Sequence, residues 1–495
     1  MITDEQQQRD KELSQSGVTQ QHFTEDTGLS TWKDDPRNPY NWPPAKKNSI
    51  FFVLLMTILN SCVGSSLPSN GIPFIKKEFG VESQSQEALP NSCYLIGYVF
   101  GPLVWAPMSE QQGRRFLTIG TFFLFTIFTM ACGLSRNWAT LLVLRLLSGI
   151  FASGPIAVVT GVLADIFQDA RARGRAVALY MVATSFGPLL GPIISGFAST
   201  ELGWRWSFWI ATMLAGATLL PLLFLPETHG KLLRRKYQGP DDSAPRTRQK
   251  GDRRKYIKTV LLRPLHMLLF EPIVTASSAY LALVYGIFYM SFQAYPIIFQ
   301  NIYRMSPGIC GLAYLPIGAG CLLFLPVFWL YDNYLLHLER VGNTWYNKNK
   351  EGCRRLPLAC LGGPLFAASL FWLGWSASES VPFAAPMLAG VPFGFGFICI
   401  FIALMNVLTD SYEIYAASAN AASSCSRSLL ATVLPLATTP MFTDLGVPGA
   451  CSLLGGLSAL MSVIPFIFIW KLKEIKQRSK FCNMLKEEKN RAQLG

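Results

Sequence analysis

Long uncharged apolar stretches recur along the chain, and they constrain its fold more than any other feature. A helix needs roughly 20 mostly apolar residues to cross the hydrocarbon core of a bilayer. Short segments of alternating hydrophobicity, the pattern of a membrane β-barrel, do not occur. The sequence therefore predicts an all-α integral membrane protein with twelve transmembrane helices. The twelve stretches are residues 49–68, 89–108, 116–134, 138–160, 176–199, 205–225, 267–292, 308–331, 356–375, 382–408, 414–437 and 449–470.

The composition excludes several other classes of protein. Only 15% of the residues are charged, whereas soluble domains carry about 25%. The basic residues that give the net charge of +13 lie between the apolar stretches and not on a polar domain. We therefore expect no nucleic-acid partner. The 11 cysteines are scattered and show no metal-ligand spacing, so we expect no metal site.

The basic residues predict the orientation in the membrane. With the N-terminus inside, the cytoplasmic segments contain 36 of the 43 Lys and Arg residues, and the outer loops contain five. An excess of Lys and Arg marks the cytoplasmic side of membrane proteins. The first 46 residues are polar and contain no apolar core of a signal peptide, so the first helix is expected to direct insertion. Both termini are therefore predicted to be cytoplasmic.

One long basic stretch divides the predicted helices into two groups of six. Each group has an Arg pair before its third helix, Arg114-Arg115 and Arg354-Arg355. Two six-helix halves with pseudo-symmetry and a site between them at the membrane midplane form a known transporter architecture. The basic stretch is interpreted as a flexible linker, with a lipid-binding or regulatory patch as the alternative. The predicted segments are a cytoplasmic tail (1–48), an N-terminal six-helix bundle (49–225), a basic cytoplasmic linker (226–266), a C-terminal six-helix bundle (267–470) and a cytoplasmic tail (471–495).

Two arginines lie inside predicted spans, Arg145 and Arg427. A charge at the centre of a bilayer costs roughly 2.5–3.5 kcal/mol on insertion scales, so each must face the bundle interior or water. Either arginine could serve transport, or it could bind backbone carbonyls and hold helices together. No Asp or Glu lies at the centre of a predicted span, so a proton carrier would be a carboxylate near a helix end. Those carboxylates are Glu110, Asp165, Glu271, Asp332, Asp410 and Glu413.

Small residues and prolines are concentrated in the fifth predicted helix. Glycines spaced four and five residues apart create a smooth face that a second helix can approach closely. Prolines remove backbone hydrogen bonds and bend a helix. This face suits a contact between helices that move during transport. Its residues are Gly187, Pro188, Gly191, Pro192 and Gly196.

Polar and aromatic side chains in the second half could line a substrate site. Aromatic faces suit bulky, partly apolar solutes, and isolated polar groups fix the orientation of such a solute. Ordinary packing is the alternative for any single aromatic residue. The candidates are Tyr285, Tyr289, Gln293, Asn406, Asn420 and Arg427.

Several stretches resemble the major facilitator superfamily, in particular its fungal twelve-span drug:proton antiporter branch. The resemblance implies the major facilitator fold. It also implies that Glu110 and Arg114 stabilise the inward-closed state, and that Arg145 favours the ionised form of a nearby carboxylate. The predicted gating and proton-coupling set is Glu110, Arg114, Arg115, Arg145 and Asp165. The stretches that carry the resemblance are residues 35–43, 101–115, 145–149, 187–196 and 225–228.

The sequence thus predicts a proton-coupled secondary active exporter of an amphipathic organic solute, such as a drug, a toxin or a fungal secondary metabolite. An uptake permease or polyamine transporter of the same superfamily is the alternative. A membrane-embedded enzyme would need His, Cys or carboxylate groups clustered at one depth, so we expect no enzyme. The expected partners are the solute, protons and the lipid bilayer, and the proton gradient replaces any cofactor. We expect a monomer in the plasma membrane, with a vacuolar or vesicular membrane as the alternative.

Overall fold

The computed structural model describes residues 32, 35–238, 262–342, 354–479 and 481–484. The described residues form helices and connecting segments, without a strand, so the predicted all-α class is confirmed. Most of the predicted N-terminal tail, residues 239–261 of the linker and the last residues of the C-terminal tail lie outside the described part.

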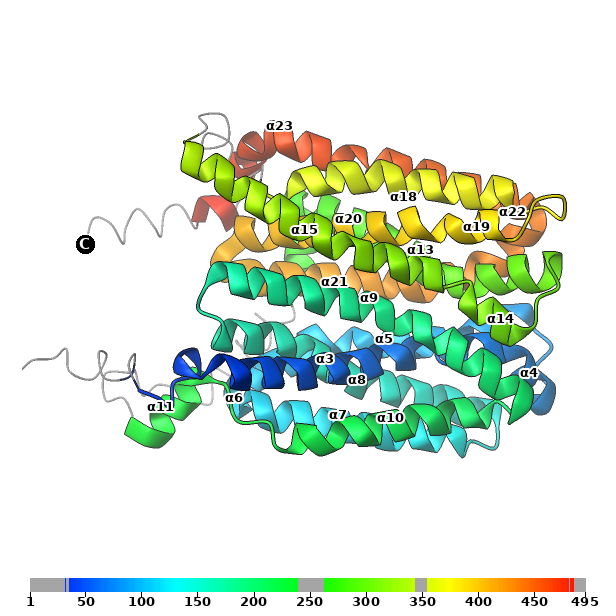
Figure 1. Cartoon of the computed structure of the whole chain (residues 1–495), viewed down its shortest axis with the longest axis horizontal. Coiled ribbons are helices and arrows are strands. Elements are labelled where there is room, and N and C mark those ends of the chain that lie inside the picture. Colours follow the sequence, from blue (N-terminus) through cyan, green and yellow to red (C-terminus); the bar gives the residue numbers. More distant parts are fainter. Residues whose placement is uncertain (1–31, 33–34, 239–261, 343–353, 480, 485–495) are drawn as a thin grey trace, which may run out of the picture.

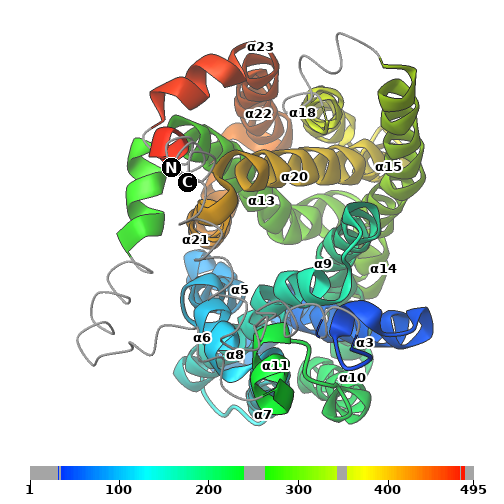
Figure 2. The ribbon, with the colours of Figure 1, turned by 90° about the vertical axis from the view of Figure 1, so that its left-hand side faces the viewer.

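The first half of the chain forms one group of helices (Figure 2). Asn137 caps α8 by accepting a hydrogen bond from the amide of Thr140, and Asp169 caps α9 through the amide of Ala172. Such caps satisfy amides that have no partner inside the helix. The helices are α3 (Pro44–Ser66), α4 (Ile72–Phe79), α5 (Leu89–Tyr98), α6 (Ala106–Gln112), α7 (Arg114–Gly133), α8 (Trp138–Ile166), α9 (Ala170–Glu201) and α10 (Arg205–Leu223).

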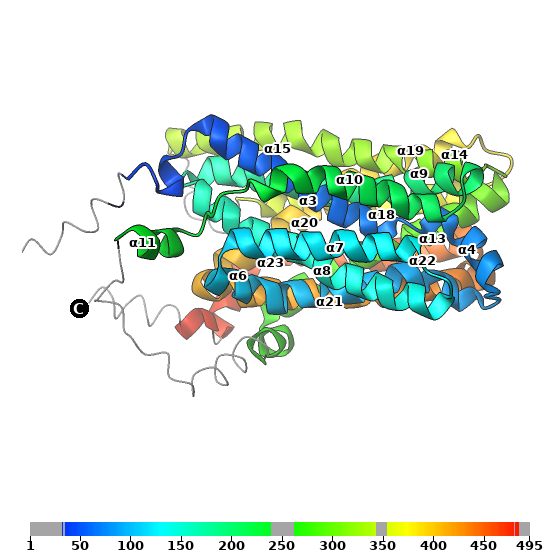
Figure 3. The same cartoon turned by 90° about the horizontal axis from the view of Figure 1, so that it is seen from below.

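The second half forms the other group, and the short helix α11 (Gly230–Gln238) lies at one end of the molecule, in the predicted linker (Figure 3). In the second half, turns interrupt several of the predicted spans. Each of these spans therefore consists of two helical pieces. The helices are α13 (Pro272–Tyr295), α14 (Pro307–Leu312), α15 (Leu315–Val341), α18 (Leu356–Ser376), α19 (Ala384–Leu388), α20 (Gly390–Tyr412), α21 (Ala416–Val433), α22 (Thr438–Met461) and α23 (Val463–Arg478).

Ten helical segments of the described chain are long and apolar enough to cross a membrane. One of them, Ala416–Arg478, has 63 residues and contains the non-helical Gly446. A continuous helix of this length would measure about 95 Å, about three times the hydrocarbon thickness, so this segment is long enough for two predicted spans. The pieces α5 and α6, joined by a π turn at Gly101–Trp105, cover another predicted span and are not among the ten. The number of twelve spans is still a prediction. The length of Ala416–Arg478 and the presence of α5 and α6 both favour it.

The beginning of α3 and the end of α23 lie at the same end of the bundle, which requires an even number of crossings (Figure 1). We call this end, which also carries α11, the basic end, and we call the other the opposite end. The two groups of helices lie side by side, with α9 and α14 at their boundary (Figure 2).

Small residues let the two groups approach closely near the opposite end. A Cβ atom at Gly311 of α14 would stand 2.8 Å from the Cα of Ile193 on α9. A Cβ at Gly308 would stand 2.7 Å from the ring of Phe197, and one at Gly196 would collide with the carbonyl of Pro307. We call this contact between α9 and α14 the glycine seam. Its backbones touch because these residues carry no side chain.

A buried carboxylate ties the end of the chain to the second group. Glu271, 2% exposed, precedes α13 and accepts hydrogen bonds from the hydroxyl of Tyr412 at 3.0 Å and from that of Ser479 at 2.5 Å. Its other oxygen accepts from the amide of Phe481 at 3.2 Å. The segment after α23 is therefore held against the start of α13.

Candidate functional site

The loop between α6 and α7 is built around the carboxylate of Glu227. This carboxylate accepts hydrogen bonds from the backbone amides of Arg114 at 2.9 Å and Arg115 at 3.1 Å, and so caps α7. A negative charge is favourable at a helix N-terminus, where amides have no partner. Gly113 has φ of +101°, and a Cβ there would collide with Glu227, so this position requires glycine.

The side chain of Arg114 extends from the loop to the end of α8. Its Nε lies 3.2 Å from a carboxylate oxygen of Asp165, and its Nη1 donates to the hydroxyl of Ser109. The guanidinium lies over Gly161, where a Cβ would stand 2.5 Å from it. Arg114 is buried, so this ion pair is shielded from water more than a surface pair.

The structure thus brings Arg114, Arg115 and Asp165 together, whereas Glu110 is exposed and forms no ion pair with a described residue. Glu227, and not Glu110, contacts the amides at the start of α7. We call Gly113, Arg114, Asp165 and Glu227 the loop-motif site. The stretch 225–228 was part of the resemblance, but the sequence does not reveal that it folds back onto α7.

His229 lies beside the loop-motif site, and the charges of this site change its pKa. Partial burial and the positive charge of Arg114 lower the pKa of His229 below its ordinary value. The imidazole is therefore held in its neutral form more strongly than in water.

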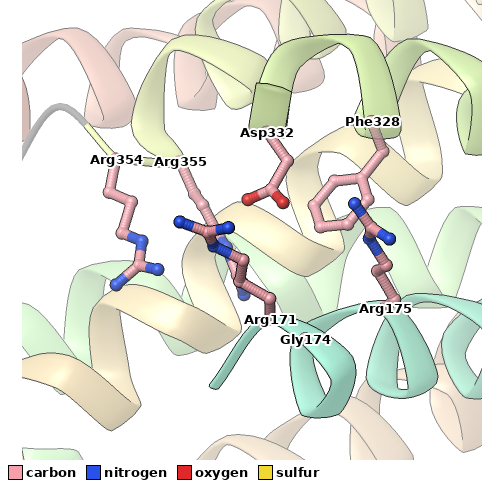
Figure 4. Close-up of a pocket in the computed structure, with 7 residues that line it drawn as sticks. All are labelled: Arg171, Gly174, Arg175, Phe328, Asp332, Arg354 and Arg355. Carbon is pink, nitrogen blue, oxygen red and sulfur yellow. The ribbon is translucent and has the colours of Figure 1, made fainter. Parts of the chain in front are cut away.

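The second half has a corresponding arrangement before α18. Arg355 donates from its Nη1 to the side-chain oxygen of Asn406 on α20, where the first half uses the carboxylate of Asp165. Its guanidinium also lies near Gly174 of α9, so it reaches across to the first half. A pocket opens at this contact between the halves (Figure 4). The residues that line it are Arg171, Gly174, Arg175, Phe328, Asp332, Arg354 and Arg355.

Each of the three guanidinium nitrogens of Arg145 donates to a backbone carbonyl. The side chain is 1% exposed, and its Nη1 and Nη2 donate to the carbonyls of Gly64 at 2.7 Å and Ser65 at 3.1 Å. These carbonyls belong to the last turn of α3, where helical carbonyls have no partner inside the helix. The Nε donates to Pro90 at 2.9 Å, and the guanidinium covers the ring of Tyr94.

This geometry matches the alternative in which Arg145 binds backbone carbonyls and holds helices together. The helices are α3, α5 and α8. The titratable groups within its electrostatic reach in the described chain are cysteines and tyrosines. The structure therefore brings no described carboxylate to Arg145 for it to act upon.

The glycine–proline motif of α9 contacts helices on two sides. Gly187 packs on Cys62, where a Cβ would stand 2.5 Å from the neighbouring Cβ, and Gly191 packs on Ser66, both on α3 of the same half. Pro192 has no amide hydrogen, so the carbonyl of Pro188 lacks its helical donor. This carbonyl accepts instead from the hydroxyl of Ser66 at 2.5 Å. Only Gly196 of the predicted glycines faces the other half, in the glycine seam.

Polar contacts reinforce the seam between the halves near the opposite end. The amide of Asn70 donates to the carbonyl of Pro192 at 3.1 Å and to that of Pro307 at 3.0 Å. The hydroxyl of Ser92 donates to the carbonyl of Thr432 at 2.8 Å. The two halves are therefore joined at the opposite end by both packing and hydrogen bonds.

A polar and aromatic cluster lies where α13, α20 and α21 face the first half. The guanidinium of Arg427, which is 9% exposed, lies 4.5 Å from the ring centre of Phe401 and 5.7 Å from that of Tyr285. Tyr285 and Tyr289 are neighbours on α13, with ring centres 4.9 Å apart. The hydroxyl of Tyr289 lies 3.0 Å from that of Ser65, which belongs to α3. We call these five residues the central cluster, and both halves contribute to it.

Comparison with known proteins decides the family. The model of the Major Facilitator Superfamily matches residues 53–435. The chain belongs to this superfamily. It is 38% identical over 471 residues to the "MFS-type efflux pump MFS2" of Trichophyton rubrum, covering 92% of this chain and 78% of that protein. It is 34% identical to the "Major facilitator superfamily multidrug transporter mdrA" of Aspergillus fumigatus, over 91% of this chain and 75% of that protein.

Solved structures of the superfamily share the fold. The proton:xylose symporter XylE bound to 6-bromo-6-deoxy-D-glucose matches with a TM-score of 0.62 and 18% identity, covering 87% of this chain and 96% of that chain. The partially occluded inward open conformation of XylE from E. coli matches with a TM-score of 0.60 and 18% identity, over 86% of this chain and 98% of that chain. As a member of the superfamily, the chain is a multi-pass membrane transporter and not an enzyme.

The predicted substrate residues of this superfamily member do not all lie together. Tyr285, Tyr289 and Arg427 belong to the central cluster. The side chain of Gln293, in the orientation that satisfies its neighbours, donates to the carbonyl of Pro435 at 2.6 Å and accepts from the amide of Ala88 at 3.2 Å. It therefore joins the two halves near the opposite end. Asn406 binds Arg355.

Asn420 donates to the hydroxyl of Thr409 at 3.1 Å, near the basic end and away from the central cluster. Sequence reasoning missed Phe401 and also Tyr180 of α9, which lies within electrostatic reach of Arg427 and Tyr285. Both are aromatic residues in long apolar helices, where the sequence gives no signal that separates them from ordinary packing residues.

Proposed function

We propose that the chain exports amphipathic organic solutes, such as drugs, toxins or fungal secondary metabolites, in exchange for protons. The observation that carries the proposal is the central cluster, to which both halves contribute and in which Ser65 of α3 meets Tyr289 of α13. When two halves rock against each other, a site of this kind is exposed first to one side and then to the other. The relatives named as efflux pumps support the outward direction.

The basic end is the cytoplasmic end in this proposal, because most of the Lys and Arg residues of the described chain lie there. Both termini are then cytoplasmic, and the glycine seam closes the outer side. The solute would reach the central cluster from the cytoplasm and leave after the seam opens. One chain contains both halves, so the protein acts as a monomer in this proposal. The membrane in which it acts is the plasma membrane.

Protons couple to this cycle through Asp165 in the proposal. Its carboxylate pairs with Arg114 at the basic end, and protonation would remove the charge that holds the pair. Arg114 would then lose one of its two side-chain partners. Each proton that enters gains about 2.3 kcal/mol per 100 mV of membrane potential, so the gradient serves as the energy source and no cofactor is needed.

An efflux assay tests the proposal. Cells that express the chain are loaded with a panel of fluorescent amphipathic dyes, and retention is measured with and without a protonophore. Export that stops with the protonophore, and that the Asp165→Asn variant reduces at equal membrane abundance, is the expected result. Asp169→Asn, which changes an exposed capping carboxylate on the neighbouring turn, is the matched control. Efflux that is indifferent to the protonophore would contradict proton coupling, and uptake would contradict export.

A further inference from the structure

Arg427 carries a buried charge that the described chain does not neutralise. Its Nε is buried and has no hydrogen-bond partner among the described residues, and its guanidinium lies over the rings of Phe401 and Tyr285. Among the described residues, the titratable groups within its electrostatic reach are Tyr285, Tyr180 and Cys425, none of which is a carboxylate. A buried cation without a counter-charge is costly. Its neighbourhood thus lacks one negatively charged group.

The fold offers other ways to satisfy a buried guanidinium, and Arg145 uses them. Arg145 has hydrogen bonds from each of its three nitrogens to backbone carbonyls. Arg427, inside α21, has no such carbonyl bond among the described residues, and its guanidinium lies against aromatic rings instead. Donors without a partner in such a position are suited to an acceptor that arrives with a ligand.

Polar atoms without partners continue along one face of α21. Asn420, Ser423 and Arg427 follow each other at intervals of three and four residues, which places them on the same side of the helix. The side-chain oxygens of Asn420 and Ser423, like the Nε of Arg427, have no hydrogen-bond partner in the described chain. This face leads from the basic end toward the central cluster and offers polar groups along the way.

The other neighbours of Arg427 are aromatic and come from both halves. The ring of Phe401 stacks on Phe397 with centres 5.5 Å apart, and Tyr285 lies between Phe401 and Tyr289. Tyr180 of α9, in the first half, lies within electrostatic range of Arg427. Flat ring faces favour a planar, apolar body, whereas the guanidinium forms a planar fork that matches a carboxylate.

We propose that the transported solute is a planar aromatic anion, a carboxylate or a phenolate, whose negative group binds Arg427 while its rings pack on Tyr285 and Phe401. The inference rests on the proposed function, because it names the class of solute for the same site. Cationic solutes, polyamines included, would be repelled by the guanidinium. The potential of a cell, negative inside, also drives an organic anion outward, in the direction of export.

A series of three probes that differ only in charge tests the inference. Binding of a naphthoate, its neutral naphthamide and a cationic naphthylmethylammonium to the purified full chain is measured by calorimetry. The naphthoate is expected to bind at least about tenfold more tightly than the other two, as a charge-assisted bidentate contact provides. The variant Arg427→Gln is expected to lose this preference and to bind the naphthamide within about twofold of the original chain.

Two further variants keep the test independent of folding. Arg427→Lys retains the charge and is expected to recover part of the preference, because a lysine cannot form the bidentate contact. Tyr285→Phe retains the ring and is expected to preserve the preference. Size-exclusion profiles establish that each variant is folded. Equal binding of the three probes, no binding of the naphthoate, or a preference that survives Arg427→Gln would overturn the inference.

The same probes in proteoliposomes separate this inference from the proposed function. Proton-dependent efflux of the neutral or cationic probe, without efflux of the naphthoate, overturns the anion inference and leaves the exporter intact. If none of the three is exported although an imposed proton gradient drives efflux of an amphipathic dye, the anion inference is again overturned. If the naphthoate binds through Arg427 but no solute moves with a proton gradient, the proposed function fails and the binding specificity stands.

Discussion

Two buried arginines, one in each half, have opposite surroundings. Arg145 donates to three backbone carbonyls, whereas Arg427 contacts aromatic faces and has a buried Nε with no hydrogen-bond partner in the part of the chain that the structure describes. Both are almost inaccessible to water, so burial alone does not distinguish them. The first arginine is used by the fold, and the second is available to a ligand. The role of a buried charge in a membrane helix is therefore defined by its partners and not by its depth.

The two loops that carry an Arg pair differ in a similar way. Arg114 binds the carboxylate of Asp165, and Arg355 binds the amide of Asn406. A carboxylate can take up a proton and lose its charge, whereas an amide is neutral throughout. The arginine contact of the first half thus involves a group that can be neutralised by a proton, and the contact of the second half does not.

Replacing the two arginines with methionine should give the largest difference. Arg145→Met leaves the carbonyls of Gly64, Ser65 and Pro90 without their donor, and each such group costs about 1–3 kcal/mol when buried. We expect a loss of several kcal/mol and a low yield of folded protein. Arg427→Met removes an unneutralised charge, so its thermal stability should equal or exceed that of the original chain. Thermal unfolding in detergent measures both, and equal stability of the two variants would contradict the comparison.

Substitutions in the glycine seam should have the next largest effect. Gly311→Leu forces a side chain against the backbone of Ile193, and overpacking of this kind costs about 1–3 kcal/mol. We expect the halves to separate near the opposite end and export to fall about tenfold or more. Gly216→Leu is the matched control, because a Cβ at this position meets no atom within 4 Å. A transport assay at equal membrane abundance decides, and a larger defect in the control would count against the seam.

Exchanging the partners of the two loop arginines should have a moderate effect. Asn406→Asp gives Arg355 a carboxylate, and the stronger contact should slow turnover, since a charged hydrogen bond adds about 1 kcal/mol. Asp165→Asn removes the carboxylate from Arg114 and should make export less dependent on pH. Initial rates across a pH series measure both variants. An unchanged pH profile for Asp165→Asn would show that the charge of this pair does not matter for coupling.

The smallest effect should come from His229. Its pKa in the folded chain is lower than its ordinary value of 6.5, because of burial and of Arg114. The neutral form is favoured in the folded state, so this contribution to stability is complete above about pH 6.5 and is lost as the pH falls through the lowered pKa. His229→Gln should flatten the decrease in thermal stability between neutral and mildly acidic pH. A decrease of the same size in the variant would assign the pH dependence to other groups.

The apolar stretches predicted most of the fold, because lipid allows few structures other than helices. The all-α class and the membrane location are confirmed. The sequence also identified both buried arginines, because a charged residue inside a long apolar stretch is unfavourable in lipid and must face the protein interior or water. It did not separate their roles, because the partners of Arg145 come from α3 and α5, more than fifty residues away.

The candidate substrate residues do not all lie together, and the sequence could not show this for the same reason. Tyr285, Tyr289 and Arg427 meet, but Gln293, Asn406 and Asn420 bind partners near the two ends of the bundle. A polar residue in an apolar stretch shows only that it needs a partner. Whether that partner is a carbonyl, an arginine or a solute depends on the rotation of the helix and on its neighbours.

The contact between Glu271 and the segment that follows α23 has a practical consequence for anyone who shortens or labels this chain. A truncation after Arg478 would remove two of the three hydrogen-bond donors described for the Glu271 carboxylate. The buried carboxylate would then keep only the hydroxyl of Tyr412. Affinity tags and fluorescent fusions are therefore best attached beyond residue 484, so that Ser479 and Phe481 keep their contacts with Glu271.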